Sequence, residues 1–438
     1  MFNKLFKFTQ TKLNILYENS LFLQSLDKLI FASIILVFLA STCMSSDAIG
    51  FIALITTFLT VLQLLTKPDD KCEPNHFELW LLAYFMIVVI SLAGSTLFAL
   101  SLKGFMKTVT YLGFYISTVH YLKNNTNKIP YILAAIGLCV SFESIAGILQ
   151  NFAHVDEIST WQDVSKLNPE EVMTRVYGTL KPYNPNLLGG YFVVGIPSLF
   201  GLGAYLLNNK HTKLGLTSLG FSLLSVVTLF LTGCRGSYMG CMVMFIATFL
   251  IAAKFLWNKY KKVFIAILTS CVVLGTSALL FISSLRARVF SIFAMRQDSS
   301  NSFRFNVYHS SLEMFRDNWL LGIGVGNKNF REIYGLYMRT GFDALSAYNI
   351  FLETAVESGI FALIAFLGFL FVMLKDGICF ILKSTKINEI IFVSTAIISI
   401  CGVMVHGFVD TVFFRPQIQF IFWTMAAIIS SVLYNKQM

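Results

Sequence analysis

The sequence predicts an all-α, polytopic integral membrane protein with about twelve transmembrane helices. Of its 438 residues, 56% are hydrophobic and only 13% are charged, and the mean hydropathy is +0.71, whereas soluble domains carry about 25% charged residues. A spanning helix needs about 20 apolar residues, so the composition has room for roughly a dozen. A membrane β-barrel is excluded because the apolar runs, such as FIALITTFLTVLQLL from Phe51, are long and do not alternate.

Apolar windows between charged or Asn-rich breaks predict the elements in chain order. Residues 1–28 are expected to form a cytoplasmic, amphipathic N-terminal segment, because lysines alternate with apolar residues and no cleavage site follows the first apolar run. Five spans are expected in residues 29–150, four in 186–283 and three in 347–438, before a short cytoplasmic tail. The twelve predicted spans are 29–46, 48–66, 77–98, 104–122, 129–150, 186–207, 214–232, 237–257, 263–283, 347–374, 389–410 and 417–434.

Two stretches, 151–185 and 284–346, are too polar to span and are predicted as extracytoplasmic loops, the larger one between the ninth and tenth helices. An even number of spans puts both termini on one side. Lysine is in excess in the short loops of that side, which predicts cytoplasmic termini in the cell inner (plasma) membrane. The net charge of +10 then reflects topology and contact with membrane lipid, and nucleic acid is not expected as a partner.

All the arginines fall on the predicted outer side, where few lysines accompany them. A guanidinium is a planar, permanently charged fork that suits phosphate or carboxylate. This asymmetry predicts an outward-facing site for an anionic group. The alternative is that arginine merely suits folded extracytoplasmic loops. The residues are Arg175, Arg235, Arg286, Arg288, Arg296, Arg304, Arg316, Arg331, Arg339 and Arg415.

Four motifs carry a resemblance to a known superfamily. They are YNPNLLGGYF from Tyr183, LTGCRGSYMG from Leu231, RFNVYHSSLEMFRDNWLLGIGVGNKNF from Arg304 and SAYNIFLETAVESGI from Ser346. In this order within a twelve-span chain, they resemble the O-antigen ligase and polymerase superfamily of envelope polysaccharide assembly, over roughly residues 175–435. The runs IYGLYMRTGFDALSAYNIFLETAVESGI and GFVDTVFFRPQIQFIFW look most like its inorganic-carbon-transport B branch, which is named for bicarbonate transport.

The superfamily resemblance implies an inverting, metal-independent glycosyltransferase that uses no cofactor. It would move a glycan from undecaprenyl diphosphate to a hydroxyl of an acceptor lipid or glycan. Arg235 and Arg304 match the arginines that stabilise the departing diphosphate, and Arg316 and Arg415 are further candidates for binding the anion. Alternatively, Arg235 is a snorkelling interfacial anchor and Arg304 a solvated surface charge.

The general base is where the sequence departs from the superfamily. Active ligases place a His-Asn pair where this chain has Tyr348-Asn349, and an unperturbed tyrosine, with a pKa near 10, is a poor base at neutral pH. The candidate catalytic residues are therefore Tyr348 itself, His309, Glu353 and Glu357. The sequence leaves three functions open, so whether the protein is an enzyme is undecided at this point. They are glycan transfer, transport of bicarbonate or another small anion, and the role of a family member that kept the fold and lost the base.

Three ionisable residues in the predicted spans are functional candidates because charged groups are costly in a membrane. They are Glu143 in the fifth span and His406 and Asp410, one helical turn apart, in the eleventh. An ion pair of Asp410 with Arg415 is the structural alternative. The three glycines of GIGVGN, from Gly322, predict a tight turn that either brings backbone amides to an anion or only folds the outer loop.

Overall fold

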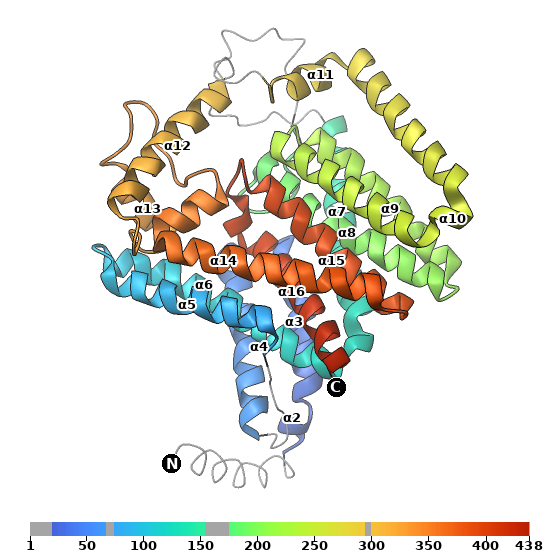
Figure 1. Cartoon of the computed structure of the whole chain (residues 1–438), viewed down its shortest axis with the longest axis horizontal. Coiled ribbons are helices and arrows are strands. Elements are labelled where there is room, and N and C mark those ends of the chain that lie inside the picture. The colour runs from blue at the N-terminus through green and yellow to red at the C-terminus, as the bar shows by residue number, and fades with distance from the viewer. Residues whose placement is uncertain (1–19, 67–73, 154–174, 294–298, 438) are drawn as a thin grey trace.

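The computed structural model describes residues 20–66, 74–153, 175–293 and 299–437, and their regular secondary structure is helical throughout (Figure 1). Most of the predicted N-terminal segment, residues 154–174 of the first predicted loop, and Arg296 lie outside these ranges. The helices are α2 Leu21–Gln24, α3 Leu26–Ser41, α4 Ser46–Thr66, α5 His76–Gly94, α6 Phe98–Asn124, η1 Thr126–Lys128, α7 Ile129–Phe152, α8 Pro185–Asn208, α9 Thr212–Leu231, α10 Arg235–Phe281, α11 Ser283–Phe290, α12 Ser299–Asp317, α13 Asn327–Tyr334, α14 Ile350–Lys383, α15 Ile387–His406, η5 Val412–Phe414 and α16 Pro416–Gln437.

Nine helices in the described part of the chain are long and apolar enough to cross a membrane, namely α4, α5, α7, α8, α9, α10, α14, α15 and α16. The prediction of a polytopic, all-helical membrane protein is confirmed at this level. Two other predicted spans correspond to helices that are not among these nine. Helix α3 has only 16 residues, and α6 contains three lysines. The expected total of twelve stays a prediction.

Helix α10 accounts for two predicted spans. Its 47 residues would be about 70 Å long if straight, twice the thickness of a membrane's hydrocarbon core. The backbone of Tyr260 is not helical, with φ −125° and ψ 26°. The rings of Phe249 and Phe264 lie 5.3 Å apart, so the chain folds back on itself at this point, as Figure 1 shows.

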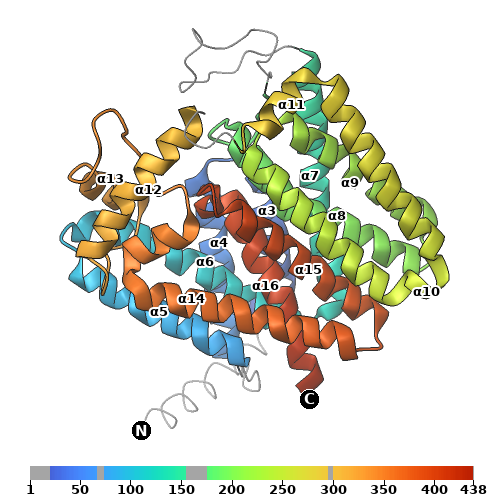
Figure 2. The ribbon, with the colours of Figure 1, turned by 45° about the horizontal axis from the view of Figure 1, so that its top comes forward.

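The loops gather at two ends of the bundle, as alternating crossings require. At one end, the Thr179 hydroxyl donates a hydrogen bond to the carbonyl of Thr42, and the Asn186 amide donates one to Asp410. We call this the loop-rich end, because it also holds α11, α12 and α13 (Figure 2). Every described arginine lies in these connections or beside them.

The opposite end carries the short connections that the sequence assigns to the cytoplasmic side. The Asn208 amide donates a hydrogen bond to Asn388, which joins the ends of α8 and α15. The Lys123 ammonium lies 3.9 Å from the centre of the Tyr434 ring, which joins α6 to α16. Which side of the membrane each end faces stays a prediction.

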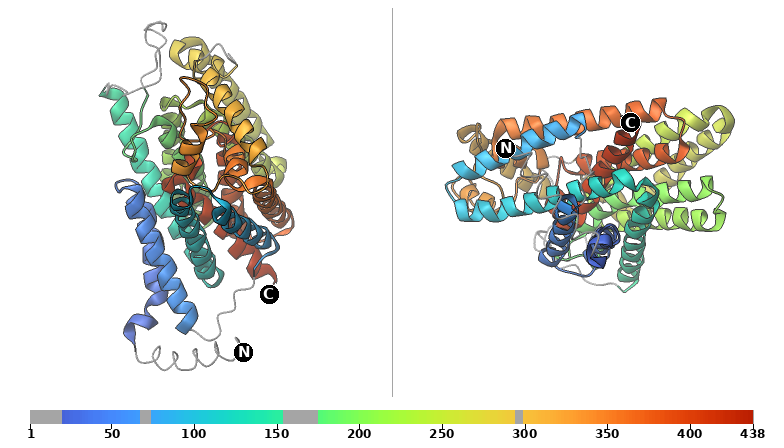
Figure 3. Two further views of the ribbon diagram at one scale, coloured as in Figure 1. Left: turned by 90° about the vertical axis from the view of Figure 1, so that its left-hand side faces the viewer. Right: turned by 90° about the horizontal axis from the view of Figure 1, so that it is seen from below.

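The interior of the bundle consists of α8, α15 and α16, whose side chains are mostly buried, whereas α10 is largely exposed. Helices α5 and α14 pack side by side along one face (Figure 2). The hairpin of α3 and α4 stands beside α7 on another side of the bundle (Figure 3). This arrangement brings the ends of α8, α10, α14, α15 and α16 together beneath α12.

Helix α14 is broken at Gly359, where φ is 80° and ψ is 176°. Its Val356 carbonyl accepts a hydrogen bond from the amide of Ile323 at 3.0 Å, and its Glu357 carbonyl accepts one from Gly324 at 2.8 Å. The GIGVGN turn thus satisfies the carbonyls that the break would leave unpaired. Because Gly322 and Gly324 have φ of 71° and 97°, the turn needs residues that tolerate positive φ.

Candidate functional site

Three arginines converge on the turn between α9 and α10. The guanidinium of Arg175 donates to the carbonyl of Thr232 at 2.8 Å, and that of Arg288 donates to the carbonyl of Gly233 at 2.7 Å. Arg235, only 7% exposed, donates to both oxygens of Ser291 at 3.1 Å. We call Arg175, Arg235 and Arg288 the arginine cluster.

The other two members of the arginine cluster act on the charge of Arg288. Burial, and then the charges of Arg175 and Arg235, lower the pKa of Arg288 to about 10. A guanidinium loses affinity for its proton only where the charged form is poorly solvated or faces other cations. Three convergent guanidiniums that repel one another are suited to a multiply charged anion, which would relieve that repulsion.

Asp410 links the arginine cluster to Arg304 on α12. Its Oδ2 lies 3.6 Å from a guanidinium nitrogen of Arg304 and accepts a hydrogen bond from the Asn186 amide at 3.0 Å. The carbonyl oxygen of the Asn186 side chain accepts from Arg175 at 2.6 Å. The ion pair of Asp410 is therefore with Arg304, from a distant part of the sequence, and not with the neighbouring Arg415.

One nitrogen of the Arg304 guanidinium is available to donate a further hydrogen bond. Its Nε is buried and has no hydrogen-bond partner within the described residues. A second connection leads to the arginine cluster, since Asn301, one turn earlier on α12, donates to the same Ser291 carbonyl that Arg235 contacts. One chain of contacts therefore joins Arg304 to Arg175, and a second joins Arg235 to Asn301 on the helix of Arg304. A common cavity for Arg235 and Arg304 stays a prediction.

Tyr348 lies directly beneath Arg304. The guanidinium carbon is 5.8 Å from the centre of the tyrosine ring, and the Tyr348 carbonyl accepts a hydrogen bond from the Tyr308 hydroxyl at 3.2 Å. The backbone of Tyr348 has φ 51°, a strained conformation for a residue with a side chain, which occurs most often at functional sites. Burial, and then the charge of Asp410, raise the pKa of Tyr348 to about 12, so its phenol is neutral at physiological pH.

The other expected residues on α12 and at α16 face elsewhere. His309 is exposed, with its Nδ1 3.4 Å from Glu313, and its five-residue spacing rotates it about 140° around the helix from Arg304. Arg316 is exposed and lies about 18 Å along the helix axis from Arg304. Arg415 is exposed at the start of α16. Their roles in catalysis or anion binding stay predictions.

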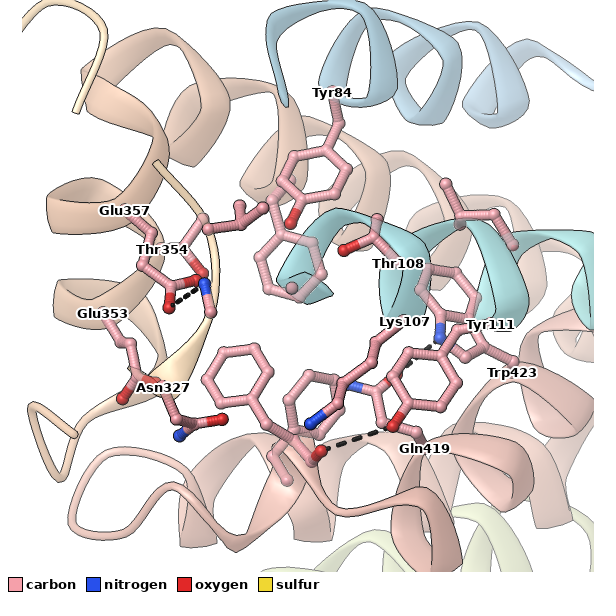
Figure 4. Close-up of a pocket in the computed structure, with 17 residues that line it drawn as sticks. Tyr84, Lys107, Thr108, Tyr111, Asn327, Glu353, Thr354, Glu357, Gln419 and Trp423 are labelled. Atoms are coloured by element: carbon pink, nitrogen blue, oxygen red, sulfur yellow. Dashed lines mark hydrogen bonds between the residues drawn. The ribbon is translucent and has the colours of Figure 1, made fainter. Parts of the chain in front are cut away.

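Glu353 and Glu357 line a separate cavity below the GIGVGN turn (Figure 4). Oε2 of Glu353 accepts the backbone amide of Ala347 at 3.1 Å, and Oε1 of Glu357 accepts that of Gly326 at 2.8 Å. The anion that the glycine turn binds is thus a carboxylate of the chain itself. Through this hydrogen bond, Glu353 contacts the residue that directly precedes Tyr348, while Glu353 itself lines the cavity.

Glu143, the buried carboxylate of α7, has its partner in the first loop. Its two oxygens accept hydrogen bonds from the Thr179 hydroxyl at 2.5 Å and from the Thr179 amide at 2.9 Å. The adjacent Gly178 has φ 67°, and a side chain there would clash with Glu143. Through these hydrogen bonds, Glu143 fixes the position of the loop segment that carries Arg175.

His406 pairs with Cys234, which was not among the residues expected to form a functional site. The Cys234 sulfur lies 3.6 Å from His406 Nε2, in a site made narrow by Gly190 and Gly236, where a Cβ would lie within 2.9 Å of the imidazole. Burial raises the pKa of Cys234, but the hydrogen bond and the charge of His406, with a hydrogen bond from Ser237, together lower it to about 7. In the sequence, Cys234 directly precedes Arg235 in the motif CRG. That position was the available indication that Cys234 belongs to the site.

Residues 220–367 match the family model described as O-antigen ligase. The matched segment begins within α9 and ends within α14, so it contains Arg235, Arg304 and Tyr348. Arg175 and Asp410 come from outside it. No curated protein matches the chain.

The family match and the nine apolar helices support a multi-pass membrane protein with a ligase- or polymerase-type role in glycan handling. The finer resemblance to the inorganic-carbon-transport B branch stays a prediction.

Proposed function

We propose that the protein transfers a glycan from an undecaprenyl-diphosphate carrier to a hydroxyl of an acceptor lipid or glycan. The observation that carries this proposal is the arginine cluster, which faces Arg304 across the Asn186–Asp410 link within a chain that matches the O-antigen ligase family. Guanidiniums fixed in this way would stabilise the charge that develops on the departing diphosphate. No metal ion is needed for that role.

We assign the proton-accepting role to Asp410. In the free protein, Arg304 and Asn186 share its Oδ2. A bound diphosphate attracts Arg304 more strongly than a single carboxylate does, because it carries more charge. When Arg304 turns to the diphosphate, Asp410 Oδ2 keeps one neutral donor, from Asn186, and can accept the proton of the acceptor hydroxyl. The base would thus form only when the donor substrate is bound.

Tyr348 has a positioning role in this proposal. A phenol whose pKa is raised to about 12 donates a hydrogen bond but does not abstract a proton at neutral pH. It supports Arg304 from below and would orient the acceptor hydroxyl towards Asp410. His309, Glu353 and Glu357 keep no catalytic role in this assignment.

We place the loop-rich end on the outer face of the plasma membrane, with both termini in the cytoplasm. The excess of lysine in the opposite connections supports this orientation, and the lipid carrier would then reach the arginines from the outer leaflet. Cysteine-labelling reagents that do not cross the membrane should modify a cysteine introduced at Asn327 and not one introduced at Asn388.

The test is glycan transfer by protein reconstituted in liposomes with a lipid-diphosphate-linked glycan and a glycolipid acceptor. Wild type should transfer the glycan, and Arg235→Ala and Asp410→Asn should each lose about 100-fold or more, as for loss of one transition-state donor or of the base. Arg331→Gln should retain activity, because Arg331 is an exposed residue of α13 that pairs with Asp343.

The same liposomes separate the alternatives. Uptake of bicarbonate that Arg235→Ala abolishes, without transfer by any variant, would replace the proposal by anion transport. Transfer that appears only in Tyr348→His would show that the native chain has lost its base.

A further inference from the structure

The cavity below the GIGVGN turn has the size of a small polar molecule. It lies between α5, α6, α14 and α16 and measures about 70 Å³ for the centres of water-sized molecules. One water needs about 10–15 Å³ on this scale, so the cavity has room for about five waters, comparable to one sugar ring. A lipid diphosphate with its glycan does not fit there.

Two carboxylates form one wall of the cavity. Glu353 and Glu357, one helical turn apart on α14, are 1% and 9% exposed. Each uses one oxygen to accept a backbone amide, from Ala347 and Gly326, and the second oxygen of each accepts no hydrogen bond from the residues that the structure describes. Buried carboxylates are costly unless their oxygens find donors. A ligand that donates hydrogen bonds would supply them.

The opposite wall presents donors. The ammonium of Lys107 and the hydroxyls of Tyr84 and Thr108 point into the cavity (Figure 4). Among the described residues, no ion pair within 4 Å joins Lys107 to Glu353 or Glu357. Acceptors and donors thus face each other across a gap and need a molecule that offers both kinds of group. Hydroxyl groups donate and accept at the same time.

Aromatic rings complete the lining, with Phe366, Phe413 and Trp423 among them. Sites for small molecules combine apolar walls with a few fixed polar groups. A sugar ring has apolar C–H faces and hydroxyl edges, which match aromatic walls and the carboxylate and ammonium groups respectively. A free phosphate would match Lys107 but would be repelled by the two carboxylates.

We propose that this cavity binds one sugar residue of the acceptor glycan, an inference that rests on the proposed function. Glu353 bridges the two sites, because its Oε2 holds the Ala347 amide immediately before Tyr348. A sugar in the cavity would fix the acceptor chain next to the Tyr348 segment, so that a hydroxyl of a neighbouring residue reaches Asp410. Lys107, Glu353 and Glu357 are therefore positioning residues for the acceptor.

Direct binding tests the cavity without any transfer reaction. Saturation-transfer NMR on purified protein in phosphatidylcholine nanodiscs, with a panel of free hexoses, heptoses and N-acetylhexosamines, should give saturation of at least one sugar. Lys107→Met and Glu357→Gln should each reduce it about tenfold, as for the loss of one charged hydrogen bond. Lys103→Met, one turn earlier on α6 and outside the cavity lining, should not.

Three outcomes would overturn the inference. They are no saturation of any sugar by wild type, equal saturation by Lys107→Met, and saturation of glycerophosphoethanolamine in place of sugars, which would make the cavity a lipid head-group site. Glu353→Gln gives an independent variant if Glu357→Gln does not fold.

Kinetics distinguish a failure of this inference from a failure of the proposed function. In the transfer assay, Lys107→Met should raise the KM for the acceptor about tenfold and leave the KM for the lipid-linked donor unchanged. If wild type transfers glycan and the acceptor KM does not respond, the cavity proposal is wrong and the function stands. If wild type transfers nothing, the NMR result alone decides what the cavity binds.

Discussion

Replacing Arg235 by glutamine should stabilise the free protein and weaken its binding of diphosphate. The fall of the Arg288 pKa from 12.5 to about 10 corresponds to about 3 kcal/mol against its protonated form. Burial contributes most, then Arg175, then Arg235. Arg288 is partly exposed, so solvent screens the repulsion. We therefore expect removal of the Arg235 charge to raise the free energy of unfolding by about 1 kcal/mol.

The loss of the two hydrogen bonds from Arg235 to Ser291 offsets little of this gain. The Ser291 carbonyl still accepts from Asn301 at 3.0 Å, and the Ser291 hydroxyl still donates to the Arg288 carbonyl at 2.8 Å. Neither oxygen is left unpaired, so the usual cost of an orphaned buried group is avoided. Binding is different, because a lost charged hydrogen bond to the anion costs about 1.5–3 kcal/mol, or roughly 10- to 100-fold in affinity.

The assay is thermal unfolding, followed by tryptophan fluorescence at pH 8 with increasing inorganic pyrophosphate. At this pH, Arg288 is protonated in both the folded and the unfolded protein, so the full energetic penalty of holding its charge in the folded protein is present. It would be relieved only as pH rises from about 10 towards 12.5, where the unfolded chain binds more protons. Arg235→Gln should unfold at a higher temperature than wild type without pyrophosphate and respond less to its addition. A lower unfolding temperature with an unchanged pyrophosphate response would refute the reasoning, and Arg331→Gln is the control.

Three further predictions concern the neighbours of the arginine cluster. Tyr348→Phe should lower transfer by about tenfold at most, the cost of one positioning hydrogen bond, because a phenol with a pKa of about 12 is not the base; a loss of 100-fold in the transfer assay would contradict this. Asp410→Asn should lower the free energy of unfolding by about 2–4 kcal/mol, since it leaves Arg304 without its carboxylate, and chemical denaturation with Arg304→Gln in a double-mutant cycle should show coupling between the two. Gly236→Ala should cost about 1–3 kcal/mol by pushing a methyl group against His406, and an unfolding temperature equal to that of wild type would show that the helices separate freely.

The membrane class of the fold was predictable from composition because spanning helices need long apolar runs, which are local in sequence. The fold-back in α10 was predictable for the same reason, since the lysines after Trp257 interrupt an apolar run that is too long for one crossing. The resemblance that pointed to Arg235, Arg304 and Tyr348 was also local, because each motif is a short segment.

The partners of those residues were not predictable, because they come together only through packing. Proximity in sequence favoured Arg415 as the partner of Asp410, but the ends of α8, α12 and α15 meet so that Arg304 and Asn186 take that place. His406 and Cys234, 172 positions apart, meet for the same reason.

The sequence by itself determined which residues are apolar enough to span a membrane and which outer segments carry arginine. Only the tertiary structure decided that Arg175 and Arg288 join Arg235, and that Glu357 binds the glycine turn and faces Lys107 across a cavity. The physical reason is that helix formation and membrane insertion depend on neighbouring residues, whereas a charge finds its partner according to how whole helices pack.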